Sequence, residues 1–198
     1  MFWYIFIIIV GYLIGSINLS IVLSRKKGKD IREQGSGNAG ATNTLRTMGK
    51  KTAAIVLLFD ILKGVVVVLL AKLMSGLVQD ANVFIQLAAI AVILGHNFPI
   101  YYGFKGGKGV ATSLGVILCI NPLSAIICLV FAIVLMVITK MVSLSVILAA
   151  ILYPILILFF ASNYFVFAIV LVLLLIYRHR TNIKRIMSGN ENKISFDK

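Results

Sequence analysis

The chain has 198 residues, of which 61% are hydrophobic and only 13% are charged, and its formal net charge is +13. An average soluble domain is roughly half apolar and about a quarter charged, so this composition excludes an ordinary soluble domain and a disordered chain. Two cysteines, Cys119 and Cys128, are too few for a disulfide-stapled secreted module, and both lie inside apolar runs. Because apolar runs approaching ~20 residues recur along the chain, the sequence predicts a helical membrane protein.

The first apolar run extends from Tyr4 to Ser24, and the basic cluster Arg25, Lys26 and Lys27 follows it. A secretory signal peptide has its basic residues before the apolar run, so we expect a retained helix whose N-terminus lies outside the cell. Further spans are expected over residues 52–71, 83–100, 110–121, 123–139, 142–160 and 164–177. The predicted fold is an all-α polytopic helical membrane protein with about seven transmembrane helices and a cytoplasmic C-terminus. We expect a single domain over residues 1–198, with a flexible cytoplasmic tail over 185–198.

This topology can be compared with the distribution of basic residues. Every lysine and arginine except Lys63 and Lys72 falls in a segment expected to face the cytoplasm, as the positive-inside rule predicts. The weakest spans are 110–121 and 164–177, because ~14 helical residues cover only about 21 Å of a hydrocarbon core that is ~30 Å thick. Five or six spans therefore remain open alternatives to seven.

Acidic residues are too sparse to build most catalytic sites. No two of the carboxylates lie together as a divalent-metal site requires, and no H-E-x-x-H or C-x-x-C spacing is present. We therefore expect no metal and no other cofactor. Asp60 and Lys63, three residues apart in one span, are expected to form an intramembrane ion pair.

Polar residues gather in segments that are expected to face the cytoplasm. The first, over residues 35–43, reads G-S-G-N-A-G-A-T-N and is followed by Arg46. It matches the dinucleotide fingerprint G-x-G-x-x-G formally, but the apolar strand that must precede a fingerprint is missing. Glycines nevertheless allow successive backbone N–H groups to converge, and a helix beginning nearby adds the positive end of its dipole. Both features favour binding of a phosphate group.

The second segment reads G-H-N-F-P at 95–99 and K-G-G-K-G-V-A-T at 105–112. It is not a phosphate loop of the G-x-x-x-x-G-K-[ST] type, because Gly109 stands where serine or threonine is required. Two lysines separated by two glycines still favour phosphate contact, whereas basic residues such as Lys26 and Lys29 are interpreted as topology signals and contacts for lipid headgroups. A third element is divided between Ser143-Leu144-Ser145 and the run R-H-R-T-N-I-K-R at 178–185.

These motifs, in this order, resemble those of the bacterial acyl-phosphate:glycerol-3-phosphate acyltransferases, the PlsY family. The resemblance covers nearly the whole chain and includes D-I-R at 30–32 and D-I-L-K-G at 60–64. It implies a multi-pass enzyme of the bacterial cytoplasmic (inner) membrane whose active site faces the cytoplasm. Such an enzyme moves a fatty acyl group from acyl phosphate to the sn-1 hydroxyl of glycerol 3-phosphate, giving lysophosphatidate and inorganic phosphate for phospholipid biosynthesis. The implied partners are these two substrates, membrane lipid and, transiently, the enzyme that makes the acyl phosphate, but no nucleic acid.

The resemblance also assigns roles to residues at the matching positions. It places Arg46 and Lys105 on the phosphate of glycerol 3-phosphate. Lys105 is also an expected catalytic residue, together with Ser143, His179 and Asn182, which are implied to hold the glycerol hydroxyls and to orient the nucleophile. The remaining substrate-binding residues, most of them implied to cradle the acyl-phosphate headgroup, are Ser36, Gly37, Asn38, Gly40, Thr42, Asn43, Gly106, Gly107 and Lys108.

Two questions about mechanism stay open at this point. We favour transfer of the hydroxyl proton to the departing phosphate of the donor, with His179 as the alternative acceptor, and the H-x-x-x-x-D arrangement of another acyltransferase class is absent. The alternative function is a transporter of a phosphorylated small anion, which would use the same basic loops. A transporter should carry charges or broken helices near the midplane of more than one span, and only Asp60 and Lys63 qualify. One position departs from the family pattern, since Asn18 stands where we expect proline.

Overall fold

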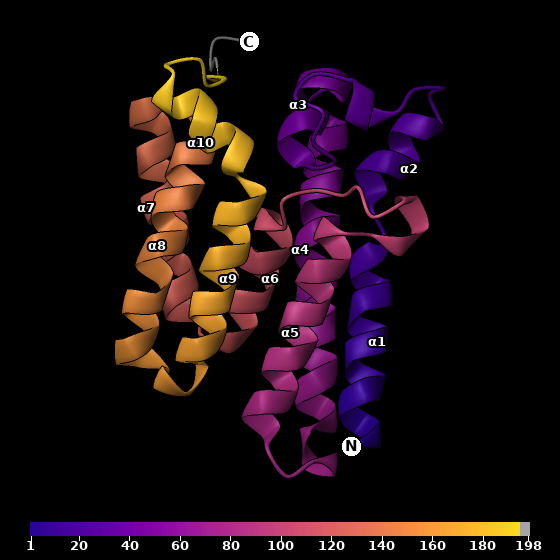
Figure 1. Cartoon of the computed structure of the whole chain (residues 1–198), viewed down its shortest axis with the longest axis vertical. Coiled ribbons are helices and arrows are strands. Elements are labelled where there is room, and N and C mark those ends of the chain that lie inside the picture. Colours follow the sequence, from indigo (N-terminus) through magenta and orange to yellow (C-terminus); the bar gives the residue numbers. More distant parts are fainter. Residues whose placement is uncertain (195–198) are drawn as a thin grey trace. The chain divides into compact units, whose positions relative to one another are not determined.

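A computed structural model describes residues 1–194, and every regular element in this range is a helix (Figure 1). The chain divides into two compact units, the first comprising Met1–Cys119 and the second beginning at Ile120. The helices of the first unit are α1 (Phe2–Ser16), α2 (Leu19–Arg25), α3 (Ala41–Met48), α4 (Lys50–Met74), α5 (Ala81–Asn97) and α6 (Val110–Ile120, ending at the boundary). The helices of the second unit are α7 (Pro122–Thr139), α8 (Val142–Phe160), α9 (Phe165–Arg178) and α10 (Arg180–Met187). Short 3-10 helices cover Ile31–Glu33, Ser75–Leu77, Ile100–Tyr102 and Ser162–Tyr164.

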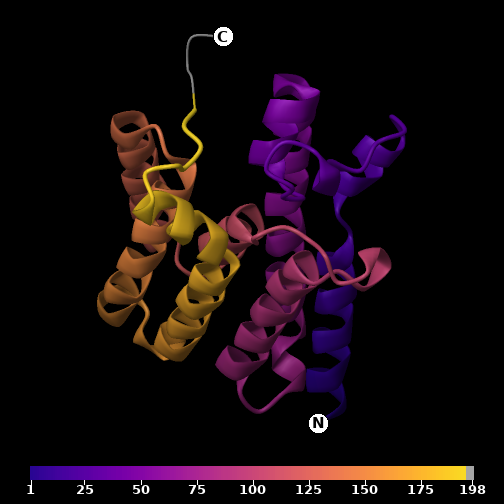
Figure 2. The ribbon, with the colours of Figure 1, turned by 45° about the horizontal axis from the view of Figure 1, so that its top comes forward.

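Close contact between glycine-bearing helix faces builds the first unit. Helices α1, α4 and α5 lie side by side in both views of the ribbon (Figures 1 and 2). A side chain on Gly15 of α1 would collide with the backbone of Val92 in α5, and one on Gly95 of α5 would collide with the backbone at Tyr12. Gly115 of α6 approaches α4 in the same way. Small residues at these contacts suit a helical membrane protein, where close van der Waals packing stabilises helix association.

In the second unit, α8 packs against both α7 and α9. The buried positions of α8 include Ser143, Ile147, Ala150, Pro154 and Ile157, which recur every three or four residues as on one helical face. The chain bends by 62° between α9 and α10, at His179. This face and this bend bring Ser143 of α8 and Asn182 of α10 to the same end of the unit, where both contact Glu191.

The number of candidate spans agrees with the alternatives of five or six that the sequence leaves open. Within residues 1–194, five helical segments are long and apolar enough to cross a membrane, and the bent pair α9–α10 would be a sixth. The segment expected at 110–121 is the 11-residue helix α6, which at 1.5 Å per residue is about 17 Å long and too short to cross the ~30 Å core. The first span is interrupted between α1 and α2, where Ile17 and Asn18 are extended.

The tail expected over 185–198 begins inside a helix. Arg185 belongs to α10, which continues to Met187. Glu191 is buried, and the backbone N–H of Ile194 donates to the carbonyl of Lys140 at 2.8 Å. Residues 195–198 of that expected tail lie outside the described residues.

Candidate functional site

The first glycine-rich segment is folded around the side chain of Asn43. Its Oδ1 accepts from the backbone N–H of Ser36 at 2.9 Å, and its Nδ2 donates to the carbonyls of Ile31 and Gln34 at 3.1 and 2.9 Å. Gly35 has a φ of +57°, and a side chain there would strike Asn43 Oδ1. Asn43 is thus buried and fully occupied by the backbone, so it shapes the turn that carries Ser36.

A second asparagine ties this segment to the break between α1 and α2. Asn18 caps α2 by accepting from the N–H of Ile21 at 3.2 Å, and it also accepts from the hydroxyl of Ser20 at 2.7 Å. Its Nδ2 donates to the carbonyl of Ala39 at 3.2 Å, and the residue is 1% exposed. Asn18, which stands where the family pattern has proline, therefore anchors the first glycine-rich segment directly.

Helix α3 begins within the segment, at Ala41. Gly40 is its N-cap, Thr42 lies in its first turn, and Arg46 lies in its last turn with an exposed side chain. The side chain of Asn38 lies close to Gly40, since a Cβ built on the glycine would be 3.0 Å from Asn38 Nδ2. The backbone at the start of α3 thus presents N–H groups where an anion is favoured.

The second glycine-rich segment folds back onto the end of α5. The N–H groups of Gly106 and Gly107 donate to the carbonyls of Asn97 and His96 at 3.3 and 3.1 Å. Lys105, at the start of the segment, is exposed, as Arg46 is in α3. Neither cation pairs with a carboxylate within residues 1–194, so both charges are available to an anion.

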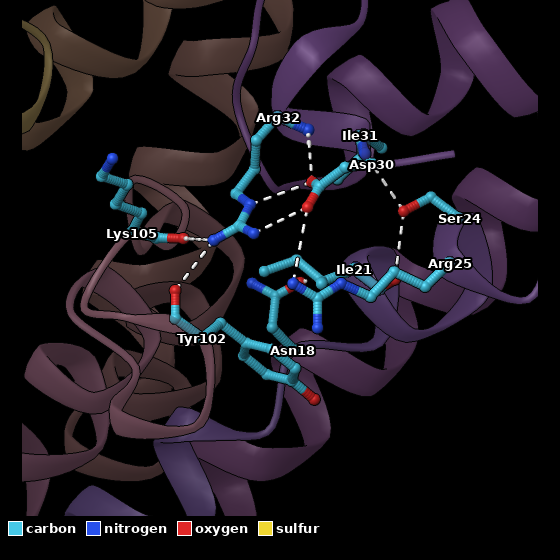
Figure 3. Close-up of polar contacts among 9 residues, drawn as sticks. All are labelled: Asn18, Ile21, Ser24, Arg25, Asp30, Ile31, Arg32, Tyr102 and Lys105. Atoms are coloured by element: carbon cyan, nitrogen blue, oxygen red, sulfur yellow. Dashed lines mark hydrogen bonds and ion pairs between the residues drawn. The ribbon is translucent and has the colours of Figure 1, made fainter. Parts of the chain in front are cut away.

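The two glycine-rich segments meet. A Cβ on Gly107 would lie 2.7 Å from the carbonyl oxygen of Ala39, so only glycine allows this approach. Beside the contact is a cavity of about 520 Å³. Its lining includes Asp30, Arg32, Gly37, Tyr102, Lys105 and Gly106. Figure 3 shows how Asp30, Arg32, Tyr102 and Lys105 are arranged.

Asp30 and Arg32 form the main ion pair at this cavity, with Arg32 Nη2 2.6 Å from Asp30 Oδ2. The guanidinium of Arg32 holds the pKa of Asp30 well below its ordinary value, although burial acts in the opposite direction. Asp30 in turn raises the pKa of Arg32. Both shifts favour the charged forms, and the pair leaves the positive charge of Lys105 unneutralised.

A buried cluster lies behind the second segment. The expected ion pair between Asp60 and Lys63 is confirmed, with 2.8 Å between Oδ1 and Nζ. Lys63 Nζ also donates to the carbonyls of Gly15 and Ile17 at 3.1 and 3.0 Å, and it lies 2.8 Å from His96 Nδ1. His96 is the residue whose carbonyl receives Gly107 N–H, so the cluster connects the α1–α2 break to the glycine-rich turn.

In the second unit, Ser143 and Asn182 converge on one carboxylate. Ser143 Oγ and Asn182 Nδ2 donate to Glu191 Oε1 at 2.9 and 2.7 Å, and Arg185 Nε donates to Oε2 at 3.0 Å. Burial alone would raise the pKa of Glu191, but the hydrogen bonds from Asn182, Arg185 and Ser143 outweigh it and hold the pKa below its ordinary value. The ionised carboxylate thus fixes two of the expected catalytic side chains.

His179 lies at the bend between α9 and α10 and is 3% exposed. Its Nδ1 is 2.8 Å from the carbonyl of Leu175. Because a carbonyl only accepts, Nδ1 carries a proton, and in the neutral imidazole Nε2 is then the basic atom. This backbone contact orients the ring.

The structure thus gathers the expected residues within each unit. The two glycine-rich segments and Lys105 lie together in the first unit, and Ser143 and Asn182 share a carboxylate in the second. Among residues 1–194, no group of three or more His, Cys, Asp or Glu side chains is placed to hold a metal ion.

Comparison with known proteins identifies the family. A family model described as glycerol-3-phosphate acyltransferase matches residues 5–189. The chain belongs to the glycerol-3-phosphate acyltransferase family. The expected resemblance is thereby confirmed.

Curated members of the family are similar over almost their full length. The glycerol-3-phosphate acyltransferase of Clostridioides difficile is 46% identical over 196 residues, covering 98% of this chain and 96% of the relative. That of Thermoanaerobacter pseudethanolicus is 44% identical over 189 residues, covering 94% and 93%. No large segment of either relative is therefore missing from this chain.

Solved structures of the family have the same fold. A crystal structure of PlsY (YgiH), an integral membrane glycerol 3-phosphate acyltransferase in its glycerol 3-phosphate form, matches with a TM-score of 0.90 and 38% identity, over 97% of this chain and 96% of that one. The lysophosphatidic acid form of PlsY matches with a TM-score of 0.88 and 37% identity, over 97% and 95%. This chain is accordingly an all-helical, multi-pass integral membrane protein, as expected.

Sequence reasoning missed several residues that organise the site within the family fold. No role is predicted for Glu191, and the signal that distinguishes it is its place in a basic, polar segment after the run at 178–185. Arg32 and Asp30 were recognised as part of a family motif but given no role. Asn18 was noted only as a departure from the family pattern outside the loops, and its partner Ala39, 21 residues away, could not be seen from the sequence.

Proposed function

We propose that this chain transfers a fatty acyl group from an acyl phosphate to the sn-1 hydroxyl of glycerol 3-phosphate, releasing lysophosphatidate and inorganic phosphate. Family membership supports the acceptor, as do the glycerol 3-phosphate and lysophosphatidic acid forms of PlsY. We further propose that the protein resides in a bacterial cytoplasmic membrane with the glycine-rich segments on the cytoplasmic side. The excess of basic residues in the segments around them supports this orientation.

The observation that carries the proposal is the contact between Gly107 and Ala39, which brings the two amide-rich segments together. Both substrates bear phosphate groups. The segments supply backbone N–H groups, the start of α3 and the unpaired cation of Lys105 at the edge of a 520 Å³ cavity. This combination suits binding of phosphate groups without a metal ion.

The residues of the first unit are proposed to bind the two phosphorylated groups. Arg46 and Lys105 hold the phosphate of glycerol 3-phosphate. The acyl-phosphate headgroup is held by the segment from Ser36 to Thr42 and by the Gly106-Gly107-Lys108 turn. Each charge-assisted hydrogen bond to phosphate contributes about 1.5–3 kcal/mol.

The residues of the second unit are proposed to orient the acceptor. Ser143 and Asn182, both fixed by Glu191, and His179, fixed by Leu175, hydrogen-bond the glycerol hydroxyls. The sn-1 oxygen attacks the acyl carbonyl carbon, a new ester C–O bond forms, and the C–O bond to the donor phosphate breaks. Phosphate leaves with the bonding electrons, and the hydroxyl proton passes to one of its oxygens. The mixed anhydride is already activated, so positioning and charge neutralisation supply the catalysis.

Release of inorganic phosphate by the purified chain tests the proposal. Phosphate should appear from acyl phosphate only when glycerol 3-phosphate is present, and acyl-CoA or acyl carrier protein should not replace the donor. Lys105→Ala should abolish release, whereas Lys29→Ala, which removes an exposed cation in the preceding loop, should leave it unchanged. Accumulation of a phosphorylated anion in vesicles without acceptor-dependent phosphate release would indicate the transporter instead.

Cysteine labelling tests the orientation. In a chain lacking Cys119 and Cys128, a cysteine placed at Gly76 should react with a membrane-impermeant maleimide added to intact cells. One placed at Lys29 should react only after permeabilisation. The reverse pattern would contradict the proposed orientation and leave the reaction unaffected.

A further inference from the structure

The guanidinium of Arg32 joins the two glycine-rich regions through all three of its nitrogens (Figure 3). Nε and Nη2 donate to the two carboxylate oxygens of Asp30 at 2.9 and 2.6 Å. Nη1 donates to the carbonyl of Tyr102 at 2.8 Å and, over a longer distance of 3.5 Å, to that of Lys105. Arg32 and Asp30 lie before the first glycine-rich segment, whereas Tyr102 and Lys105 lie 70 or more residues later.

The carbonyls that Arg32 contacts flank a turn with left-handed backbone. Between them lie Gly103 and Phe104, with φ angles of +66° and +59°. A residue with a Cβ is disfavoured in this left-handed region, so Phe104 needs outside contacts to remain there. Arg32 supplies two of them, one on each side of the left-handed pair.

The direction of Lys105 follows from this turn. Its carbonyl faces Arg32, while its side chain extends away from Arg32 (Figure 3). Fixing the carbonyl fixes the backbone from which the ammonium projects. Arg32 therefore acts on the direction of Lys105 without approaching its charge.

We propose that Arg32, held in place by Asp30, is a positioning residue for acyl transfer, which clamps the 102–105 turn so that the Lys105 ammonium points at the phosphate of glycerol 3-phosphate. The inference rests on the proposed function, in which Lys105 binds that phosphate. Arg32 itself touches no substrate in this arrangement, because its nitrogens are occupied by Asp30, Tyr102 and Lys105.

A lysine cannot replace this arginine. Only the planar guanidinium binds both oxygens of a carboxylate and a backbone carbonyl at the same time in fixed directions. Asp30 holds the plane of the guanidinium, and a second contact, from Arg25 at 3.5 Å, leaves that arrangement intact. Arg32→Lys therefore keeps the charge but loses the clamp.

Steady-state kinetics of the full-length purified chain test the clamp. In Arg32→Lys we expect the KM for glycerol 3-phosphate to rise about tenfold, which corresponds to one weakened charge-assisted contact. The kcat should change less than about threefold, since the residues proposed to hold the acyl donor, 36–42 and 106–108, stay in place. Asp30→Asn should shift KM in the same direction by a smaller factor, and it provides a second variant if Arg32→Lys does not fold.

Arg25→Lys is the matched control. Arg25 also contacts Asp30, and its guanidinium lies 5.6 Å from the centre of the Tyr102 ring, but it does not contact the carbonyls of the turn. Its KM for glycerol 3-phosphate should stay at the wild-type value. Equal KM values in Arg32→Lys and Arg25→Lys, or a loss of thermal stability in Arg32→Lys with KM unchanged, would overturn the clamp.

Direct binding of glycerol 3-phosphate, measured by calorimetry without acyl donor, separates the clamp from the reaction. A wild-type chain that binds glycerol 3-phosphate but releases no phosphate would refute the proposed reaction, and the ratio of dissociation constants between Arg32→Lys and wild type would still decide on the clamp. A ratio near one overturns it, and a ratio near ten supports it. A wild-type chain that does not bind glycerol 3-phosphate at all overturns both.

Discussion

The backbone of Gly107 lies against the carbonyl oxygen of Ala39, close enough that a Cβ on Gly107 would be 2.7 Å from that oxygen. The same Cβ would collide with the imidazole of His96. The contact between two segments that are far apart in the sequence thus depends on the absence of a side chain at Gly107. This contact has a direct consequence for activity.

Gly107→Ala should abolish acyl transfer, because the added methyl group must push the Lys105–Lys108 turn away from Ala39. A displacement of ~1 Å in a positioned site costs about 100-fold in rate. Turnover of glycerol 3-phosphate measures the effect. Gly76→Ala is the control, since a Cβ at Gly76 meets nothing within 4 Å, and its activity should equal that of the wild type. A Gly107→Ala chain with more than about a tenth of wild-type turnover would contradict the tight contact.

Asn18→Ala should lower stability. It removes the N-cap of α2 and leaves the buried carbonyl of Ala39 without its donor. The two losses together cost about 1–3 kcal/mol. Thermal unfolding in detergent measures this, with Asn192→Ala, an exposed position, as the control. An unfolding temperature equal to that of the control would show that Asn18 does not anchor the segment.

Local patterns in the sequence predicted the type of each segment, but not the side-chain contacts that fix its position. Apolar runs identified the long helices, and glycine with charge identified both glycine-rich segments. The partners of Asn18, Arg32 and Lys63 are 21, 70 and 48 residues away in sequence. No local pattern encodes such pairings, because they arise only when helices pack. The segment 110–121 is among the weakest expected spans for a local reason, since its helix α6 is apolar but has only 11 residues.

Glu191 provides a prediction about pH. Its folded-state pKa lies below its ordinary value of 4.5, so the ionised form is favoured by folding. Its contribution to stability is therefore complete above pH 4.5 and is lost as the pH falls through the lower folded-state pKa. The unfolding temperature of the wild type should fall over this acidic range, and in Glu191→Gln this part of the decline should be absent.

The same residue holds two expected catalytic side chains, so its removal should lower stability at neutral pH as well. Glu191→Ala leaves Ser143 and Asn182 without their acceptor, which costs about 1–3 kcal/mol of stability. Lys193→Ala, at an exposed position in the same segment, is the control. A Glu191→Gln chain that loses stability in acid as steeply as the wild type would contradict the assignment.

Lys63 and Asp60 give a prediction about a buried pair. Lys63→Met leaves the Asp60 carboxylate buried without its cation, and breaking such a pair costs about 3–5 kcal/mol. Replacing both residues, with Asp60→Leu and Lys63→Met, removes the uncompensated charge. The double variant should therefore unfold at a higher temperature than Lys63→Met alone. Lys51→Met, at an exposed position of the same helix, should leave the unfolding temperature unchanged. A double variant that is less stable than either single variant would refute the pairing.

His179 is the residue that decides where the hydroxyl proton goes. Its Nδ1 donates to the carbonyl of Leu175, so Nε2 is the acceptor atom of the neutral ring. Nε2 either takes the proton from the glycerol hydroxyl or only accepts a hydrogen bond from it. If the donor phosphate accepts the proton, His179→Gln, whose amide still hydrogen-bonds, should keep the shape of the pH–rate profile and lose only a modest factor in kcat. A histidine base would instead give a rate that falls as the pH drops through the imidazole pKa, and His179→Gln would remove that limb. Comparing kcat from about pH 6 to about pH 9 in the two chains distinguishes these cases, because imidazole titrates near neutral pH. Loss of an acid limb in the variant would assign the proton to His179 and overturn transfer to the departing phosphate.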